Sequence, residues 1–275
     1  MYGHQQPIPY KFSGLMSVFN KGETVKFLGW GVLGLALTAS VGAWAACPNA
    51  ANYEDILSTE QVMGLYDICA TYMNDDETQV LLARRYALGT HGVKKDLNQA
   101  LYYYQLSAEN GNAESQAQLA KLYIELDKTP ETRKLLKKYL STIKVTPRID
   151  SPGQRYPEEE FQGELIHPYT LLLLANERPE NKWFYPSKIR KAPSYVDELL
   201  QSYKVTDEKK QKQTRAAVAW KKRKLLERAT YLLTKKEYDE FKNTLYPAEG
   251  KADPVAREQA LAAFKKRYEE ETKGK

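Results

Sequence analysis

Residues 79–123 read QVLLARRYALGTHGVKKDLNQALYYYQLSAENGNAESQAQLAKLY and contain one complete helix-turn-helix unit and the start of a second. Five positions recur at an offset of 37 residues: Glu77, Gln79, Leu82, Ala83 and Tyr86 return as Glu114, Gln116, Leu119, Ala120 and Tyr123. A fixed period in the thirties, with apolar residues of matching size, indicates a helical repeat. Stacked helical repeats commonly form binding surfaces. The stretch therefore predicts an all-α solenoid that holds a partner.

The turns and small residues of this stretch resemble the Sel1-like repeat family, whose members are related to tetratricopeptide solenoids. The matching positions are Ala83, Tyr86, Gly89, Gly92, Val93, Asp96, Ala100, Tyr103, Ala108, Gly111, Asn112, Ala113, Gln116, Leu119, Ala120 and Tyr123. After Tyr123 the glycine loop is missing, and Asp127–Pro130 stands in its place. The resemblance therefore implies one full repeat, one shortened repeat that can act as a cap, and an atypical helix before them.

The apolar segment 27–46, FLGWGVLGLALTASVGAWAA, carries no charged side chain and follows Lys21 and Lys26. The basic start, the apolar run and Ala43-Trp44-Ala45 fit a cleaved secretory signal. The segment is also long enough to span a bilayer as an uncleaved anchor. Met16 is an alternative start to Met1 that leaves an ordinary leader. Both alternatives place the rest of the chain outside the cytoplasm, and we expect a periplasmic protein.

The two cysteines, Cys47 and Cys69, both follow the apolar segment. In an oxidising compartment we expect one disulfide between them. It would close a loop of about twenty residues and add about 3 kcal/mol by the chain-entropy estimate. The alternative is two free thiols.

The charges are divided between the two halves of the chain. Residues 47–181 hold 14 Lys/Arg and 20 Asp/Glu, a net of −6, and residues 182–275 hold 24 and 14, a net of +10. The basic half can either bind an anionic surface or fold against the acidic half.

Four regions follow from these patterns. Residues 1–46 are a signal peptide or N-terminal membrane anchor, 47–145 a Sel1-like repeat solenoid, 146–193 a proline-rich irregular segment, and 194–275 a basic helical region. Apolar periodicity and capping residues predict helices over about 58–73, 76–88, 97–109, 113–126 and 130–143. Further helices are expected around 171–174 and over 195–203, 209–233, 235–245 and 254–272. In the first helix we expect Leu65, Ile68, Cys69 and Tyr72 to share the inner face.

Residues with catalytic chemistry form no recognisable constellation, and we expect no enzyme, cofactor or metal. His4, His91 and His167 stand apart from one another, and each is expected to be structural or exposed to solvent. Glu158-Glu159-Glu160 lacks a spaced partner set, and a run of charges is usually a solvated face.

The candidate partner-binding residues are polar side chains of the repeat helices that we expect to line an exposed groove: Arg84, Arg85, Tyr102, Gln105, Gln116 and Lys121. In the Tyr102-Tyr103-Tyr104 run, three successive helical residues point about 100° apart. We expect Tyr103 and Tyr104 to pack in the core and Tyr102 to remain available at the surface.

The basic run Lys221, Lys222, Arg223 and Lys224, with Lys209, Lys210 and Lys212 before it, is the candidate site for an anionic surface. The alternative is a solvated face of an amphipathic helix. Export argues against nucleic acid as the target.

Two functions fit these observations. The first is a non-enzymatic periplasmic scaffold that binds a protein partner in the cell envelope. The resemblance implies a role in assembling, positioning or regulating an envelope machine such as a secretion system. The alternative is a cell-wall-binding or cell-wall-modifying protein that uses Glu158, Glu159, Glu160 and Glu164. A weaker option is an anchored cytosolic regulator with reduced Cys47 and Cys69.

Overall fold

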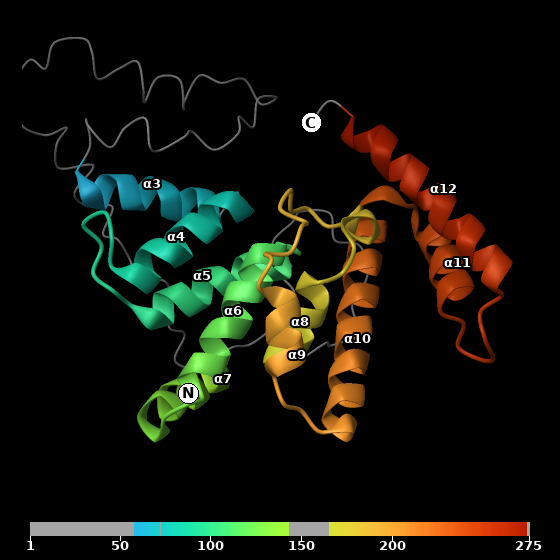
Figure 1. The fold of residues 1–275 in the computed structure, drawn as a ribbon. Helices are drawn as coiled ribbons and strands as arrows, with labels where there is room; N and C mark the ends of the chain where they lie inside the picture. Colours follow the sequence, from blue (N-terminus) through green and yellow to red (C-terminus); the bar gives the residue numbers. More distant parts are fainter. Residues whose placement is uncertain (1–57, 72, 143–164, 274–275) are drawn as a thin grey trace, which may run out of the picture. The chain divides into compact units, whose positions relative to one another are not determined.

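The computed structural model describes residues 58–71, 73–142 and 165–273 (Figure 1). Every regular element in these ranges is a helix, which confirms the predicted all-α class. The chain divides into two compact units, Met1–Met73 and Asn74–Lys275. The apolar segment 27–46 and Cys47 lie outside the described residues. Among the helices that are described, none combines the length and the apolar character needed to cross a membrane.

The first unit contains helix α3 (Thr59–Thr71). Ser58 and Gln61 start it reciprocally: Ser58 N donates to Gln61 Oε1 at 2.9 Å, and Gln61 N donates to Ser58 Oγ at 3.3 Å. The prediction that Ile68 lies on the inner face is wrong, because this residue is 39% exposed. The buried side is instead formed by Val62, Met63, Tyr66, Cys69 and Ala70. Tyr72 lies outside the described residues, and the pairing of Cys69 with Cys47 stays a prediction.

The second unit begins with α4 (Asp76–Leu88), α5 (Leu97–Glu109) and α6 (Ala113–Leu126), and its backbone repeats at the same offset as the sequence. The N-cap carboxylate of Asp75 accepts from Thr78 N at 2.9 Å, and the Asn112 amide oxygen accepts from Ser115 N at 2.9 Å. Before these caps, Asn74 and Gly111 have positive φ, 53° and 83°. The repeat inferred from side chains is thus also a repeat of turn geometry.

The turn between α4 and α5 has the predicted glycine geometry. Gly89 and Gly92 have φ values of 70° and 73°, in the left-handed region that glycine adopts without steric cost. Gly89 N donates to Arg85 O at 2.8 Å and ends α4. Asp96 then caps α5 by accepting from Asn98 N at 2.9 Å and Gln99 N at 3.1 Å.

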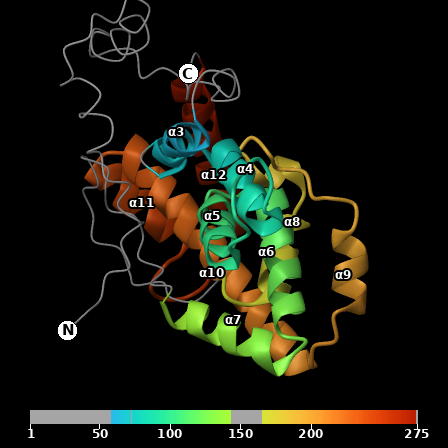
Figure 2. The same cartoon turned by 90° about the vertical axis from the view of Figure 1, so that its left-hand side faces the viewer.

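The second repeat departs from the first because a distant helix covers α6. Helix α7 (Pro130–Thr142) fully buries only Leu136, and Figure 2 shows it lying across the end of α6. The main partners of α6 are α5 and α8 (Pro168–Ala175). Helix α8 buries Leu171, Leu172 and Leu174, so the tetraleucine run is the short buried helix that its composition predicts. The position that a second repeat helix would occupy beside α6 is therefore supplied from the proline-rich region.

Residues 183–190, here called the docking segment, bind the turn between α5 and α6. Ser187 N donates to Asn110 O at 3.2 Å, and Ala113 N donates to Ile189 O at 2.9 Å. The second bond satisfies one of the amide groups that have no partner within a helix at its N-terminus. The Ser187 hydroxyl also donates to Asp76 Oδ2 at 2.6 Å. The ring of Tyr185 lies directly over Gly111.

Lys182 links the docking segment to α8. It ends the 3-10 turn η3 (Pro179–Lys182), and its side chain is fully buried. Its Nζ donates to Ala175 O at 2.9 Å and to Arg190 O at 3.2 Å. Burial lowers the pKa of Lys182 to about 8, opposed in part by the Glu177 carboxylate. The ammonium group thus ties the end of α8 to the end of the docking segment.

The C-terminal helices belong to the same unit: α9 (Val196–Ser202), α10 (Asp207–Leu232), α11 (Lys235–Leu245) and α12 (Pro254–Thr272). Trp183 bridges to α12, with ring centroids 5.7 Å from Phe264 and 5.5 Å from Tyr268. Tyr185 meets Trp220 of α10 edge-on at 5.0 Å. The boundaries near 145 and 193 therefore mark changes of composition within one folded unit.

Gly111→Ala should destabilise the protein more than Gly250→Ala does. Both glycines have positive φ, 83° and 78°, so an alanine costs about 1–2 kcal/mol at either position. At Gly111 the added Cβ would also lie 2.7 Å from the Tyr185 ring, whereas nothing lies within 4 Å at Gly250. Overpacking of this kind adds about 1–3 kcal/mol. Urea denaturation of both variants measures the difference, and equal losses would show that the Tyr185 contact does not constrain this turn.

Lys182 should make the stability of the protein rise with pH. Unfolded lysine, with a pKa of about 10.4, keeps its proton between pH 8 and 10, where folded Lys182 has released it. The free energy of unfolding should therefore increase by about 2–3 kcal/mol across this range and be flat, for this group, below pH 8. Denaturation curves of the wild type and Lys182→Met at several pH values isolate the effect. Parallel pH profiles would contradict it.

Candidate interaction surface

Three of the six predicted groove residues are buried, so the prediction that they line an exposed groove is wrong. Arg85, Gln105 and Gln116 are 5%, 8% and 0% exposed. Gln116 Nε2 donates to Ala108 O at 3.2 Å, and Gln105 Oε1 accepts from Tyr123 OH at 3.2 Å. The two amides connect α5 to α6. Their role is to satisfy buried polar groups between repeat helices.

Arg84 and Lys121 are exposed as predicted, and they occupy equivalent positions of α4 and α6, 37 residues apart. Arg84 forms an ion pair with Glu114, and its side chain remains 50% exposed. Lys121 Nζ lies 5.8 Å from the ring centroid of Tyr195, which follows the docking segment. These four residues, Arg84, Glu114, Lys121 and Tyr195, are called the α4–α6 face below. Tyr195 carries no local signal in the sequence, because its place beside Lys121 depends on the docking of residues 183–190.

Tyr104 and Tyr195 have perturbed hydroxyl groups beside the same ion pair. Burial raises the pKa of each to about 12, and the positive charge of Arg84 partly opposes the increase. Both phenols are therefore neutral at physiological pH. The α4–α6 face presents a guanidinium, a carboxylate, an ammonium and aromatic edges, which can recognise mixed-charge protein surfaces.

Tyr102 belongs to a different part of the repeat. It is half-buried and meets Tyr103 edge-on, with centroids 5.0 Å apart, while Tyr103 stacks on Tyr86 at 5.8 Å. Tyr102 also contributes to the raised pKa of Tyr139, after the larger effect of burial, so it lies toward α7. The predicted burial of Tyr103 and Tyr104 is confirmed. The expectation that Tyr102 joins Arg84 and Lys121 in one groove has no support from these contacts.

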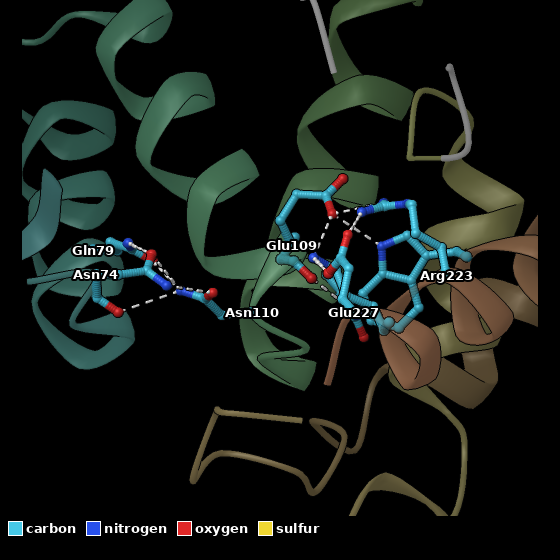
Figure 3. Close-up of polar contacts among 10 residues, drawn as sticks. Asn74, Gln79, Glu109, Asn110, Arg223 and Glu227 are labelled. Atoms are coloured by element: carbon cyan, nitrogen blue, oxygen red, sulfur yellow. Dashed lines mark hydrogen bonds and ion pairs between the residues drawn. The ribbon is translucent and has the colours of Figure 1, made fainter. Parts of the chain in front are cut away.

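A polar network fixes the turns at the starts of α4 and α6 (Figure 3). Asn74 Nδ2 donates to Asn110 Oδ1 at 2.9 Å, and Asn110 Nδ2 donates to Gln79 Oε1 at 3.0 Å. Asn112 Nδ2 donates to the buried carboxylate of Asp76 at 2.9 Å. This network was not predicted from the sequence, where the only related signal is that Asn74 stands 37 residues before Gly111, which shares its turn geometry. Networks of this kind hold surface residues in fixed relative positions.

The basic run on α10 is largely neutralised within the protein, which corrects its assignment as an anionic-surface site. Arg223 is 3% exposed, and its Nη2 lies 2.9 Å from Glu109 Oε2 (Figure 3). Its Nη1 lies 2.8 Å from Glu227 Oε1, and Lys224 Nζ lies 3.3 Å from Glu109 and 3.0 Å from Glu227. Trp220 Nε1 also donates to Glu109, at 3.1 Å. Through Glu109 the basic half folds against the acidic half, whereas Glu227 lies on α10 itself.

The other two members of the run also have partners in the chain. Lys221 Nζ lies 3.0 Å from Glu177 Oε1, and Lys222 Nζ lies 4.9 Å from the ring centroid of Tyr246. Burial alone would raise the pKa of Glu109, but the charges of Arg223 and Lys224 and the hydrogen bonds from Arg223 and Trp220 lower it overall. Glu109 is therefore ionised and acts as the counter-ion of α10.

The histidines in the described residues have separate roles. His91 is exposed in the α4–α5 turn. His167 caps α8, because its Nδ1 accepts from Tyr169 N at 3.1 Å. In the described ranges, no group of three or more His, Cys, Asp or Glu side chains could hold a metal ion. His4 and the carboxylates Glu158, Glu159, Glu160 and Glu164 lie outside these ranges.

Comparison of the chain with protein-family models, with curated proteins and with solved structures gave no match. The resemblance to Sel1-like repeats therefore rests on the residues quoted above and stays a prediction.

Arg223→Met should reduce the free energy of unfolding by about 3 kcal/mol, because it leaves Glu109 without its main counter-charge in a buried position. Lys212→Met, at an exposed position of the same helix, should change it by less than about 0.5 kcal/mol. The lowered pKa of Glu109 stabilises the wild type above the unfolded carboxyl pKa of about 4.3, and this stabilisation is lost as the pH falls. Urea denaturation at neutral and acid pH measures both effects. Equal stability of the two variants would contradict a structural role for this pair.

Proposed function

We propose that this chain is a non-enzymatic scaffold of the bacterial cell envelope that binds a partner protein through the α4–α6 face. The observation that carries the proposal is the placement of Arg84 and Lys121 at equivalent, exposed positions of α4 and α6, the corresponding helices of successive repeats. Each is combined with a second group, Glu114 or Tyr195, that limits its orientation. Repeat proteins present binding residues in this way, along a row of equivalent helical positions.

The mechanism is binding alone. The buried amides of Gln105 and Gln116 and the network around Asn110 and Asp76 hold the helices beneath the face. A partner therefore meets side chains whose backbone is already ordered, and less conformational entropy is lost on association. Arginine and tyrosine are the residue types that contribute most often to such binding energies. We expect a partner segment that carries both an acidic and an apolar group.

The envelope location rests on the apolar segment 27–46 and on the expected Cys47–Cys69 disulfide. An oxidising compartment outside the cytoplasm accounts for both features. A place in an assembled envelope machine, such as a secretion system, is what the resemblance to Sel1-like repeats implies. The surface fits this role because it combines charged and aromatic groups on a rigid helical support.

Site-specific photocrosslinking tests the proposal in the cells that make this protein. A photoreactive amino acid replaces Arg84 or Lys121 in the full chain, which carries a C-terminal tag. Both positions should yield the same crosslinked protein, because they lie on one face. With the probe at Lys121, the variant Arg84→Glu should reduce the yield by about ten-fold, which corresponds to loss of one moderate hot-spot contact.

Control probes at Lys138 on α7 and Gln259 on α12 occupy exposed helical positions away from this face. They should not yield the same product. Crosslinking of one protein from all four positions, or different products from the Arg84 and Lys121 positions, would rule out a defined partner site on the α4–α6 face.

A further inference from the structure

The first half of α10 carries cations that the fold leaves uncompensated. Lys209, Lys210, Lys212 and Arg215 lie on this half, Lys204 lies just before it, and all five are exposed. Among the described residues, Lys204, Lys209, Lys212 and Arg215 take part in no ion pair. Lys210 lies 3.7 Å from Asp207, whose side chain is 95% exposed. Such a pair in water contributes little. These five residues are called the basic end.

The second half of the same helix differs from the first, because its cations are paired with carboxylates. Lys221, Arg223 and Lys224 meet Glu177, Glu109 and Glu227 at 2.8–3.3 Å. No comparable carboxylate reaches the basic end in the described ranges. Asp127, from the end of α6, is held by Arg133 at 2.7 Å, and Asp207 and Glu208 point into solvent at the start of α10. The positive charge is therefore available to an external partner.

The surroundings of the basic end are partly apolar. The start of α8 packs here, since the Thr170 hydroxyl bonds Gln213 Oε1 at 3.0 Å. The His167 ring meets Tyr203 at 6.1 Å, and Ile166 beside it is 40% exposed. Burial, and then the charges of Lys209 and Lys212, lower the pKa of His167, which places both ammonium groups close to it. Two of the cations, Lys209 and Lys212, thus lie near His167, and the residue before His167 in the sequence is the exposed Ile166.

We propose that the basic end binds the surface of an anionic phospholipid bilayer. Four of its five cations are lysines, whose hydrated point charges need no fixed acceptor geometry, whereas specific protein contacts favour the planar fork of arginine. The side chains are exposed, and the one ion pair among them, Lys210 with Asp207, is itself in solvent, so they can adapt to mobile headgroups. Clusters of four to eight basic residues on a helix have this preference, and each lysine contributes roughly a five-fold gain in affinity. The site is separate from the α4–α6 face and does not depend on the function proposed for it.

Vesicle binding tests the proposal with the full protein as isolated from cells. Co-sedimentation is measured with vesicles of phosphatidylcholine mixed with phosphatidylglycerol and with vesicles of phosphatidylcholine alone. The readout is the ratio of the two affinities, because an apolar leader that inserts into lipid would contribute to both equally. Lys209→Glu combined with Lys212→Glu should reduce this ratio by about thirty-fold or more, and raised salt should reduce it in the wild type.

Lys265→Glu combined with Lys266→Glu is the matched control, with the same change of charge at exposed positions of α12. It should leave the ratio within about three-fold of the wild type, as expected for charges away from the contact. Far-ultraviolet circular dichroism checks that each variant is folded. An equal fall in both double variants, or no fall in either, would overturn the proposal. Binding to soluble polyglutamate without binding to the anionic vesicles would overturn it in favour of an acidic protein partner.

Discussion

The contact between Tyr185 and Gly111 constrains most of the second unit. The α5–α6 turn needs positive φ at Gly111, and the absence of a Cβ there lets the Tyr185 ring approach the backbone. The same approach brings Ser187 to Asp76 and Ile189 to the first amide of α6. The docking segment thus supplies hydrogen-bond partners to two buried polar groups, the Asp76 carboxylate at the start of α4 and the first amide of α6. Position 111 therefore serves the repeat turn and also the attachment of the docking segment, which contacts α10 and α12.

Ion pairs of Glu109 add a second attachment between the repeat helices and α10. Glu109 ends α5, where a negative charge is unfavourable because of the partial negative charge of the helix C-terminus. Arg223 and Lys224 supply the compensating charge from α10, and Trp220 donates to the same carboxylate while its ring meets the Tyr185 ring. Aromatic packing thus holds the docking segment against α10, and ion pairing holds the end of α5 against the same helix. Part of the opposite net charge of the two halves of the chain is compensated at these contacts, where Arg223 and Lys224 pair with Glu109 and Lys221 pairs with Glu177.

The sequence pattern predicted the helices and their boundaries well, because capping and turn signals are local. Asp96, Gly89 and Pro254 each mark a helix end without help from distant residues. It failed where the outcome depended on contacts between distant segments. Gln105 and Gln116 look like surface residues in sequence, yet their amides bond buried groups of the neighbouring helix. The basic run looked available because Glu109 and Glu177 are more than forty residues away from it in the sequence.

A solenoid is open-ended, since each repeat exposes the face that the next repeat would cover. In this chain α8 and the docking segment cover that face on α6, and Lys182 fixes both to each other. The array therefore ends at α6 for a physical reason, and further repeats have no surface on which to stack. The closure also brings Tyr195 beside Lys121, so that a residue from outside the repeats contributes to their exposed row. The covering of α6 and the placement of Tyr195 beside Lys121 are then two results of the same docking event.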